Sequence, residues 1–225
     1  MRPDVYVTGT DTGIGKTFAS CALLHALRGQ GMRALGMKPV ASGCTWLDGG
    51  WKNDDALALQ QASAVEVAYA DINPFALEHP LAPELAARDA GTEVTLPPIF
   101  DAYARLATKA DAVVVEGVGG WAAPLSSSLM QVDLVRALEL PVVLVVGLRL
   151  GCLNHALLSA RAIEADGATL AGWIGSHVDP AMARVEDNLK MLQARLPAPC
   201  WGVLPHMPNA EPAAMAGHLR VAQLP

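Results

Sequence analysis

A glycine-rich stretch near the amino terminus carries the residue types that bind phosphate: residues 8–17, TGTDTGIGKT. Glycines let the backbone curl so that several of its N–H groups converge on one anion. Lys16 can then reach the outer phosphates of a nucleotide, and the Thr17 hydroxyl is placed to ligate Mg²⁺. The leading glycine, Gly9, lies one residue earlier than the usual phosphate-loop spacing. A glycine-rich turn that contains a lysine by chance is the alternative, but the flanking elements favour nucleotide binding.

These flanking elements predict how the stretch is held. An apolar run at 5–7 predicts a strand, and 18–27 (FASCALLHAL) predicts a helix whose amino end adds its positive dipole to the phosphate site. A second short strand is predicted at 32–38, where a proline ends it. Strand, helix and strand in this order imply a parallel sheet, and ligands bind beyond the carboxyl ends of such strands. Lys16 and Lys38 should therefore share one edge of the sheet.

Carboxylates at two further elements are candidates for holding Mg²⁺. The buried-type strand at 112–115 ends on Glu116, and phosphate-loop enzymes often present a Mg²⁺-directing acid in this way. A solvated strand-end acid is the alternative, but the glycines within 117–120 would let the backbone approach a ligand closely. Asp54 and Asp55 open a helix, where one could cap free N–H groups and the other could ligate a metal. Their spacing does not choose between them.

The rest of the pattern continues the alternation of strands and helices. It predicts strands at 142–146, 170–175 and 201–204, helices at 56–61, 84–90, 98–109, 132–138, 154–165 and 181–196, and a mobile loop at 44–52. The proline- and alanine-rich segment at 69–90 offers no chemistry beyond a wall for a pocket. We predict a single-domain α/β fold over residues 1–225, with a mostly parallel sheet and helices on both faces, of the phosphate-loop NTPase type.

Composition argues against several classes of protein. The net charge of −6, without a long basic run, argues against nucleic acid as the main partner. The longest apolar stretch, 142–148, is too short to span a bilayer, and the first residues lack the apolar region of a signal peptide. The four cysteines are scattered without C-x-x-C spacing, which is typical of reduced thiols. We therefore predict a cytoplasmic protein that binds neither membrane nor nucleic acid.

Further short motifs make the pattern more specific than a phosphate loop alone. They are KPVASG at 38–43, DDAL at 54–57, INP at 72–74, VEG at 115–117, GCLNH at 151–155 and AGW at 171–173. With them, the chain closely resembles the dethiobiotin synthetase family over nearly its whole length. The resemblance implies ATP as co-substrate, Mg²⁺ as cofactor and a homodimer. It also implies that CO₂ and diaminopelargonic acid form a carbamate, which ATP converts to a carbamic–phosphoric anhydride before ring closure.

The resemblance also implies a role for each matching residue. Lys16 and Lys38 would be catalytic, steadying the carbamate and the transferring phosphoryl group. Thr17, Asp55 and Glu116 would hold Mg²⁺, so the family favours Asp55 over its neighbour. The nucleotide-binding residues would be Gly13, Ile14, Gly15, Lys16, Thr17, Phe18, Asp55, Glu116, Gly117, Val118, Gly119, Ser176, His177, Pro205, His206, Met207 and Glu211. The substrate-binding residues would be Thr12, Ser42, Gly151, Cys152, Leu153 and Asn154, of which the last four would receive the substrate carboxylate across the dimer interface.

Two positions depart from the family pattern. Gly13 stands where some members carry a glutamate that touches ligand, and Ser176 stands where several have an asparagine that reads adenine. A serine hydroxyl cannot span the edge that an amide spans, which predicts loose reading of the base. Recognition of adenine by backbone groups around His206 is the other interpretation.

Two other functions use the same loop. One is a nucleotide-dependent switch that controls a partner. The other is a related ATP-dependent ligase, which usually carries a glutaminase domain that a chain of 225 residues does not accommodate. A requirement for both a diamine and bicarbonate in phosphate release would separate a synthetase from a switch.

Overall fold

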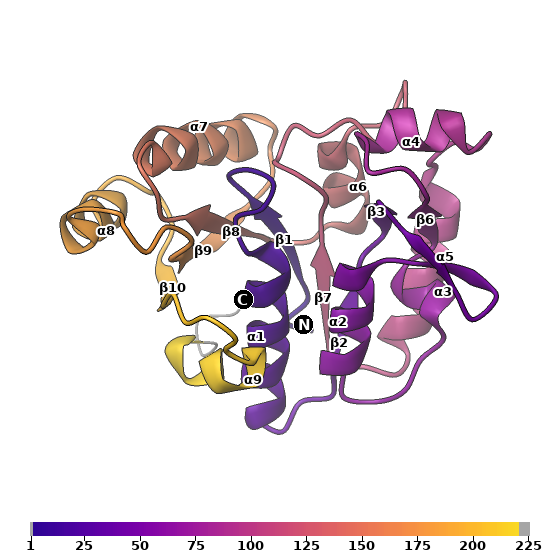
Figure 1. Ribbon diagram of the computed structural model, residues 1–225, viewed down its shortest axis with the longest axis horizontal. Coiled ribbons are helices and arrows are strands. Elements are labelled where there is room, and N and C mark those ends of the chain that lie inside the picture. The colour runs from indigo at the N-terminus through magenta and orange to yellow at the C-terminus, as the bar shows by residue number, and fades with distance from the viewer. Residues whose placement is uncertain (1, 221–225) are drawn as a thin grey trace.

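A six-stranded sheet forms the centre of the computed structural model, which describes residues 2–220 (Figure 1). The strands are β1 (Val5–Gly9), β2 (Ala34–Met37), β7 (Ala112–Glu116), β8 (Val142–Gly147), β9 (Leu170–Ser176) and β10 (Cys200–Leu204). Their spatial order is β10-β9-β8-β1-β7-β2, and every neighbouring pair is parallel. The predicted parallel sheet is thus confirmed.

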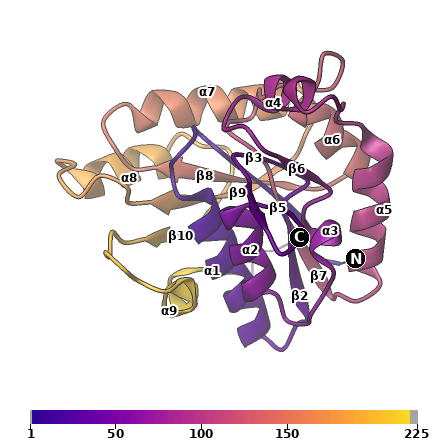
Figure 2. The same ribbon diagram turned by 45° about the vertical axis from the view of Figure 1, so that its right-hand side comes forward.

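Helices cover both faces of this sheet (Figures 1 and 2). One face carries α1 (Lys16–Gly29), α2 (Asp54–Ala62) and α9 (Pro212–Met215), and the other carries α5 (Leu96–Ala107), α6 (Gln131–Leu138), α7 (Cys152–Ala165) and α8 (Val185–Gln193). Successive strand residues point to opposite faces. In β7, Val114 therefore packs into the core beneath α1, whereas Val113 and Val115 pack into the core beneath α5 and α6.

The order of the strands brings the predicted functional residues to one edge. β7 lies between β1 and β2, with Val7 opposite Glu116 and Met37 opposite Val115. The loop that follows β1, the lysine that follows β2 and the acid that ends β7 therefore lie next to each other. This edge is the carboxyl edge of the sheet, where such folds bind ligands.

The segment predicted as a mobile loop at 44–52 is a β-hairpin instead. Its strands are β4 (Thr45–Leu47) and β5 (Gly50–Lys52), which pair antiparallel. Asp48 and Gly49 form the turn with positive φ angles of 49° and 78°. An Asp-Gly pair adopts this backbone readily, and such a pair favours two-residue hairpin turns.

The segment at 69–90 is also more structured than predicted. It contains α3 (Tyr69–Ile72), β6 (Phe75–Leu77) and α4 (Pro83–Asp89), and β6 pairs in parallel with β3 (Val40–Ser42). The predicted helix at 181–196 is shorter, because α8 begins only at Val185. The predicted helix at 154–165 begins two residues earlier, at Cys152. Within residues 2–220, no helix has the length and apolar character needed to cross a membrane.

Candidate active site

The loop between β1 and α1 has the backbone shape of an anion site. Gly13 and Gly15 have φ angles of 72° and 81°, which glycine adopts without strain. Gly15 caps α1 without a side-chain hydrogen bond, so the first N–H groups of the helix need other acceptors. A side chain at Gly9 would meet Lys16, since an added Cβ would lie 2.9 Å from its Cδ atom. The absence of a side chain at Gly9 therefore leaves room for the side chain of Lys16.

Lys16 lies over this loop and is almost fully buried. Its Nζ atom donates to the carbonyl oxygen of Asp11 at 2.8 Å. Burial, together with the positive charge of Lys38, lowers the pKa of Lys16 to about 8. Phosphate anions next to the ammonium group would favour its charged form. The amine therefore lies where a nucleotide phosphate would stabilise its charge.

Lys38 is buried at the centre of a charge cluster. Its Nζ atom lies 2.6 Å from Glu116 Oε1 and 3.1 Å from Asp55 Oδ2. Thr17 Oγ1 donates to the same Glu116 oxygen at 2.8 Å. Burial alone would lower the pKa of Lys38, but the two carboxylates outweigh burial and hold this pKa above its ordinary value. The cluster joins residues from four separate parts of the sequence.

This cluster also offers the oxygen atoms that Mg²⁺ prefers. Glu116 is fully buried, and its Oε2 atom has no hydrogen-bond partner within residues 2–220. A buried carboxylate oxygen without a partner is unfavourable, so a cation at this point would satisfy it. In the described part of the chain, no three His, Cys, Asp or Glu side chains converge as a metal site. The third protein oxygen comes from Thr17, and Mg²⁺ usually keeps water and phosphate oxygens as its other ligands.

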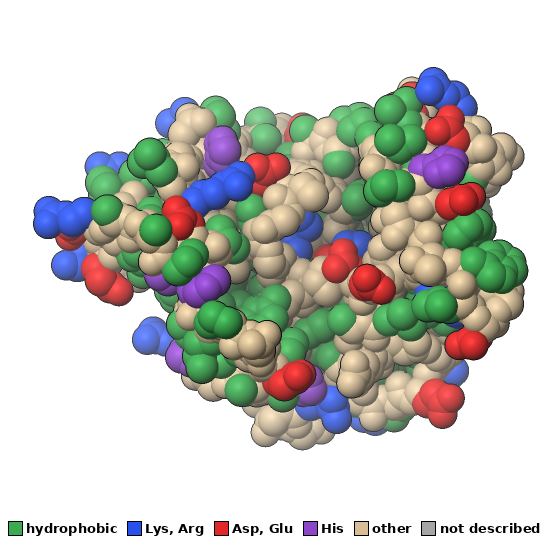
Figure 3. All heavy atoms as spheres, in the orientation of Figure 1, with side chains coloured by type: hydrophobic (Ala, Val, Ile, Leu, Met, Phe, Trp, Pro, Cys, Tyr) green, Lys and Arg blue, Asp and Glu red, His purple; other side chains and the backbone are tan. Residues whose placement is uncertain are grey.

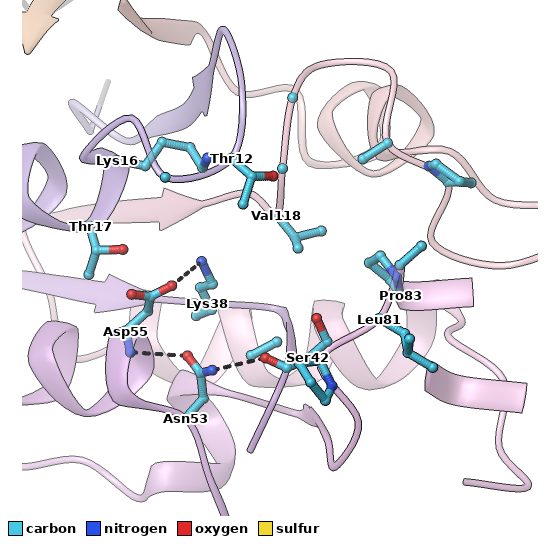
Figure 4. A pocket seen from close by; sticks show the side chains of 18 of the residues that line it. Thr12, Lys16, Thr17, Lys38, Ser42, Asn53, Asp55, Leu81, Pro83 and Val118 are labelled. Atoms are coloured by element: carbon cyan, nitrogen blue, oxygen red, sulfur yellow. Dashed lines mark hydrogen bonds and ion pairs between the residues drawn. The ribbon is translucent and has the colours of Figure 1, made fainter. Parts of the chain in front are cut away.

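A cleft of about 780 Å³ at the carboxyl edge of the sheet is lined by Lys16, Thr17, Lys38 and Asp55. Figure 3 shows this face hollowed near its centre, where acidic and basic side chains meet. Figure 4 shows Thr12 and Lys16 on one side of the cleft, with Lys38, Asp55 and Asn53 on the other. The predicted site residues that line the cleft are Thr12, Gly13, Gly15, Lys16, Thr17, Lys38, Ser42, Asp55, Val118 and Gly119.

Other predicted site residues lie outside the lining of this cleft. Ile14, Phe18, Glu116, Gly117, Ser176, His177, Pro205, His206, Met207, Glu211, Gly151, Cys152, Leu153 and Asn154 form this group. Ile14 is buried in the core, and Glu116 lies directly behind the cleft wall. Ser176 is buried behind the phosphate loop, since its hydroxyl lies 2.6 Å from the position of an added Cβ on Gly15. His206 Nδ1 lies 3.2 Å from the carbonyl oxygen of His177, at the ends of β9 and β10.

Several residues of the cleft wall were not predicted as site residues: Asn53, the run Pro80–Pro83, Ala41, Gly120, Ala123 and Pro124. Asn53 caps α2 by accepting from the backbone N–H of Asp55, and its amide donates to the carbonyl of Ser42. The predicted capping by an aspartate is therefore wrong, although an asparagine before a helix is itself a capping signal. The run Pro80–Pro83 lies in the segment at 69–90 and confirms that this segment supplies a wall of the pocket.

The loop, the lysines and the acids at the edge of a parallel sheet define a phosphate-loop nucleotide-binding protein of the α/β class. Residues 4–214 match the family model described as an AAA domain. The chain belongs to the dethiobiotin synthetase family. It is 63% identical to the ATP-dependent dethiobiotin synthetase BioD of Xanthomonas oryzae pv. oryzae (strain PXO99A) over 219 residues, 97% of this chain and 98% of that one. It is 63% identical to the protein of the same name from Xylella fastidiosa (strain 9a5c) over 215 residues, 95% of each chain.

Solved structures with low sequence identity share the fold. A ParA family ATPase from Chlorobium tepidum TLS matches with a TM-score of 0.56 at 13% identity, covering 98% of this chain and 92% of that one. The MinD cell division protein of Aquifex aeolicus matches with a TM-score of 0.54 at 15% identity, covering 97% of this chain and 88% of that one. These similarities support the phosphate-loop NTPase fold and say nothing of the substrate.

Proposed function

We propose that this protein is an ATP-dependent dethiobiotin synthetase, which joins CO₂ to diaminopelargonic acid and closes a cyclic urea. The observation that carries the proposal is one cleft lined by Lys16, Lys38, Thr17 and Asp55, in a chain 63% identical to synthetases over nearly its full length. A nucleotide-dependent switch needs neither a substrate cleft of about 780 Å³ nor a second lysine in it.

The proposed reaction begins with an amine of the substrate. This amine attacks the carbon of CO₂ and loses a proton, giving a carbamate. A carbamate oxygen attacks the γ-phosphorus of ATP, and ADP leaves. The second amine then attacks the carbamate carbon and loses a proton, and phosphate leaves with the electrons of the broken C–O bond as the ring closes.

The side chains of the cleft suit these steps. Thr12 and Ser42 line the cleft near the two lysines and would hold the carbamate through their hydroxyls. Lys16 and Lys38 would stabilise the negative charge that spreads over the equatorial oxygens during phosphoryl transfer. Such fixed cations contribute strongly because they need no rearrangement as the charge develops.

We propose that Thr17, Asp55 and Glu116 hold Mg²⁺ in this protein. The ion would neutralise phosphate charge when bound. Lys38 bridges the two carboxylates, which keeps both charges compensated within the free protein. The Glu116 oxygen without a partner in the described chain supports a cation at this point.

Changing Asp55 to Asn should raise the Mg²⁺ concentration needed for half-maximal activity by about tenfold or more, because one charged ligand is lost. The neighbouring Asp54→Asn variant is the matched control. Asp54 is exposed and lies outside the cleft, so its effect should stay within about twofold. Mg²⁺ titrations of initial rate at saturating ATP measure both. Equal shifts in the two variants would remove Asp55 from the metal site.

We also propose that the substrate carboxylate binds at the start of α7 and that a second copy of the chain completes the pocket. The N-cap residue of α7 is Gly151, which has a φ of 96° and provides no side-chain hydrogen bond to the helix. Its first N–H groups therefore need an acceptor. Leu150 beside this helix start is 96% exposed, and Leu158 on α7 is 55% exposed. Contact with a second copy would remove this apolar surface from water.

Base selection should be loose. Ser176 lies buried against Gly15, so its hydroxyl is directed at the phosphate loop and does not extend along the edge of a base. We expect kcat/KM for ATP to exceed that for GTP or CTP by less than about a hundredfold, or roughly 2.7 kcal/mol. The three nucleotides are compared with the same diamine at one Mg²⁺ concentration. A larger preference for ATP would show that other groups, such as the backbone near His206, read adenine.

We propose that the protein acts in the cytoplasm. The structure has four free cysteines, three of which are buried, and reduced thiols are typical of that compartment.

The function is tested by incubating the purified protein with diaminopelargonic acid, bicarbonate, Mg²⁺ and ATP. Mass spectrometry should detect dethiobiotin together with an equal amount of released phosphate. Omission of the diamine or of bicarbonate should abolish both products. Phosphate release that persists without the diamine would favour a nucleotide-dependent switch.

A further inference from the structure

An ion pair outside the cleft joins the phosphate loop to the turn before α7. The Arg149 guanidinium donates to Asp11 Oδ2, although the two residues are 138 positions apart in the sequence. Their side chains are 41% and 46% exposed. Ion pairs this exposed contribute little to the stability of a fold. A contribution to the stability of the fold therefore does not explain this ion pair. The position of Asp11 in the phosphate loop indicates its role more directly.

The other hydrogen bonds of Asp11 all lie within the phosphate loop. Its Oδ1 atom accepts from the backbone N–H of Thr12 at 2.8 Å, and its carbonyl oxygen accepts from Lys16 Nζ at 2.8 Å. The Thr12 N–H and the positive charge of Arg149 hold the pKa of Asp11 below its usual value. A single aspartate thus fixes two groups that line the cleft.

Arg149 in turn belongs to the turn that starts α7. Its carbonyl oxygen accepts from the N–H of Cys152 at 3.0 Å. Two further bonds connect the phosphate loop to β8, which precedes this turn: the Thr10 N–H donates to the carbonyl oxygen of Val145, and the Gly147 N–H donates to the Thr10 hydroxyl. The ion pair therefore continues the contact between β1 and β8 beyond the edge of the sheet.

We propose that Asp11 and Arg149 are a positioning pair, which holds the phosphate loop in the shape that binds nucleotide and ties that shape to the start of α7. Neither residue of the pair lines the cleft, and the pair acts through Thr12 and Lys16, which do. Because the loop is held before nucleotide arrives, less conformational freedom is lost on binding. The proposal rests on the proposed nucleotide site, but its test does not need the synthetase reaction.

The test measures the dissociation constant of ATP by calorimetry, without diamine or bicarbonate, in two single variants and the double variant. Arg149→Met removes the guanidinium, and Asp11→Asn removes the charge while keeping an oxygen for the Thr12 N–H. Each should weaken ATP binding by about fivefold, and the double variant should be no weaker than either single one, since contacting residues are coupled. Arg149→Lys keeps the positive charge and should retain most of the parent protein's affinity for ATP.

The exposed pair Arg33–Asp111 provides a matched control. It lies outside the cleft, with side chains 60% and 45% exposed, so Arg33→Met should leave ATP affinity unchanged. Melting temperatures of all variants should stay close to that of the parent protein. Additive effects of the two single variants, or unchanged ATP affinity in Arg149→Met, would overturn the proposal. So would an effect of Arg149→Met on the KM for diamine alone, which would place the guanidinium on the substrate instead.

Discussion

Replacing Lys16 by Gln should lower kcat at saturating ATP by about two to three decades. The substitution keeps nearly the same side-chain length and removes the positive charge that faces the phosphates. Loss of one preorganised electrostatic contact to a transition state costs roughly 2.7–4 kcal/mol. Because the contact strengthens as charge moves during phosphoryl transfer, kcat should fall more than the affinity for ATP.

Lys52→Gln is the control for this experiment. Lys52 lies on the β4–β5 hairpin, where its Nζ atom sits 3.8 Å from the centre of the Tyr69 ring, and it does not line the cleft. Its replacement removes one positive charge from the same protein and should leave kcat nearly unchanged. A Lys16→Gln enzyme with parental turnover at saturating ATP would exclude Lys16 from the reaction.

Replacing Lys38 by Met should destabilise the protein as well as inactivate it. Lys38 and Glu116 have side chains only 5% and 0% exposed, so the substitution leaves a buried carboxylate without its cation. Breaking a buried pair in this way typically costs about 3–5 kcal/mol. For a chain of this size, the melting temperature should fall by about 6–20 °C.

The double variant Lys38→Met with Glu116→Gln separates charge from packing. It removes both charges, so it should recover part of the lost stability while remaining inactive. Mg²⁺ should raise the melting temperature of Lys38→Met more than that of the parent. A melting temperature of Lys38→Met within about 2 °C of the parent would mean that water compensates the charge of Glu116.

The sequence was most informative where function depends on local pattern. The phosphate loop lies between a strand and a helix as predicted, because buried parallel strands are continuous apolar runs and are read directly. Lys38 and Asp55 share the cleft with the loop, as the rule for strand ends and the family resemblance together implied. These positions follow from the order of strands and helices along the chain.

Contacts between distant segments were much harder to predict. Pro80 reaches the cleft because the residues before it pair with the KPVASG loop, where the Gly43 N–H donates to His79 at 3.1 Å. Nothing in the local sequence encodes that contact. The buried position of Ser176 behind Gly15 depends likewise on how β9 packs beneath the loop. The β4–β5 hairpin is different, because the sequence does carry a hairpin-turn signal, the Asp48-Gly49 pair. The glycines of this segment also favour a mobile loop, and that was the prediction.

The position of β7 between β1 and β2 has a consequence for how this family can change over time. Glu116 ends β7 and Lys38 follows β2, and these two strands are adjacent, so the spacing of Glu116 and Lys38 is set by the interstrand distance of about 4.8 Å and by strand register. The number of residues between them in the chain does not affect it. Insertions in exposed connections, such as the Asp48-Gly49 turn, should therefore be inherited without harm. A one-residue slip in β7 would turn Glu116 to the opposite face, so length variation among descendants should be confined to the turns.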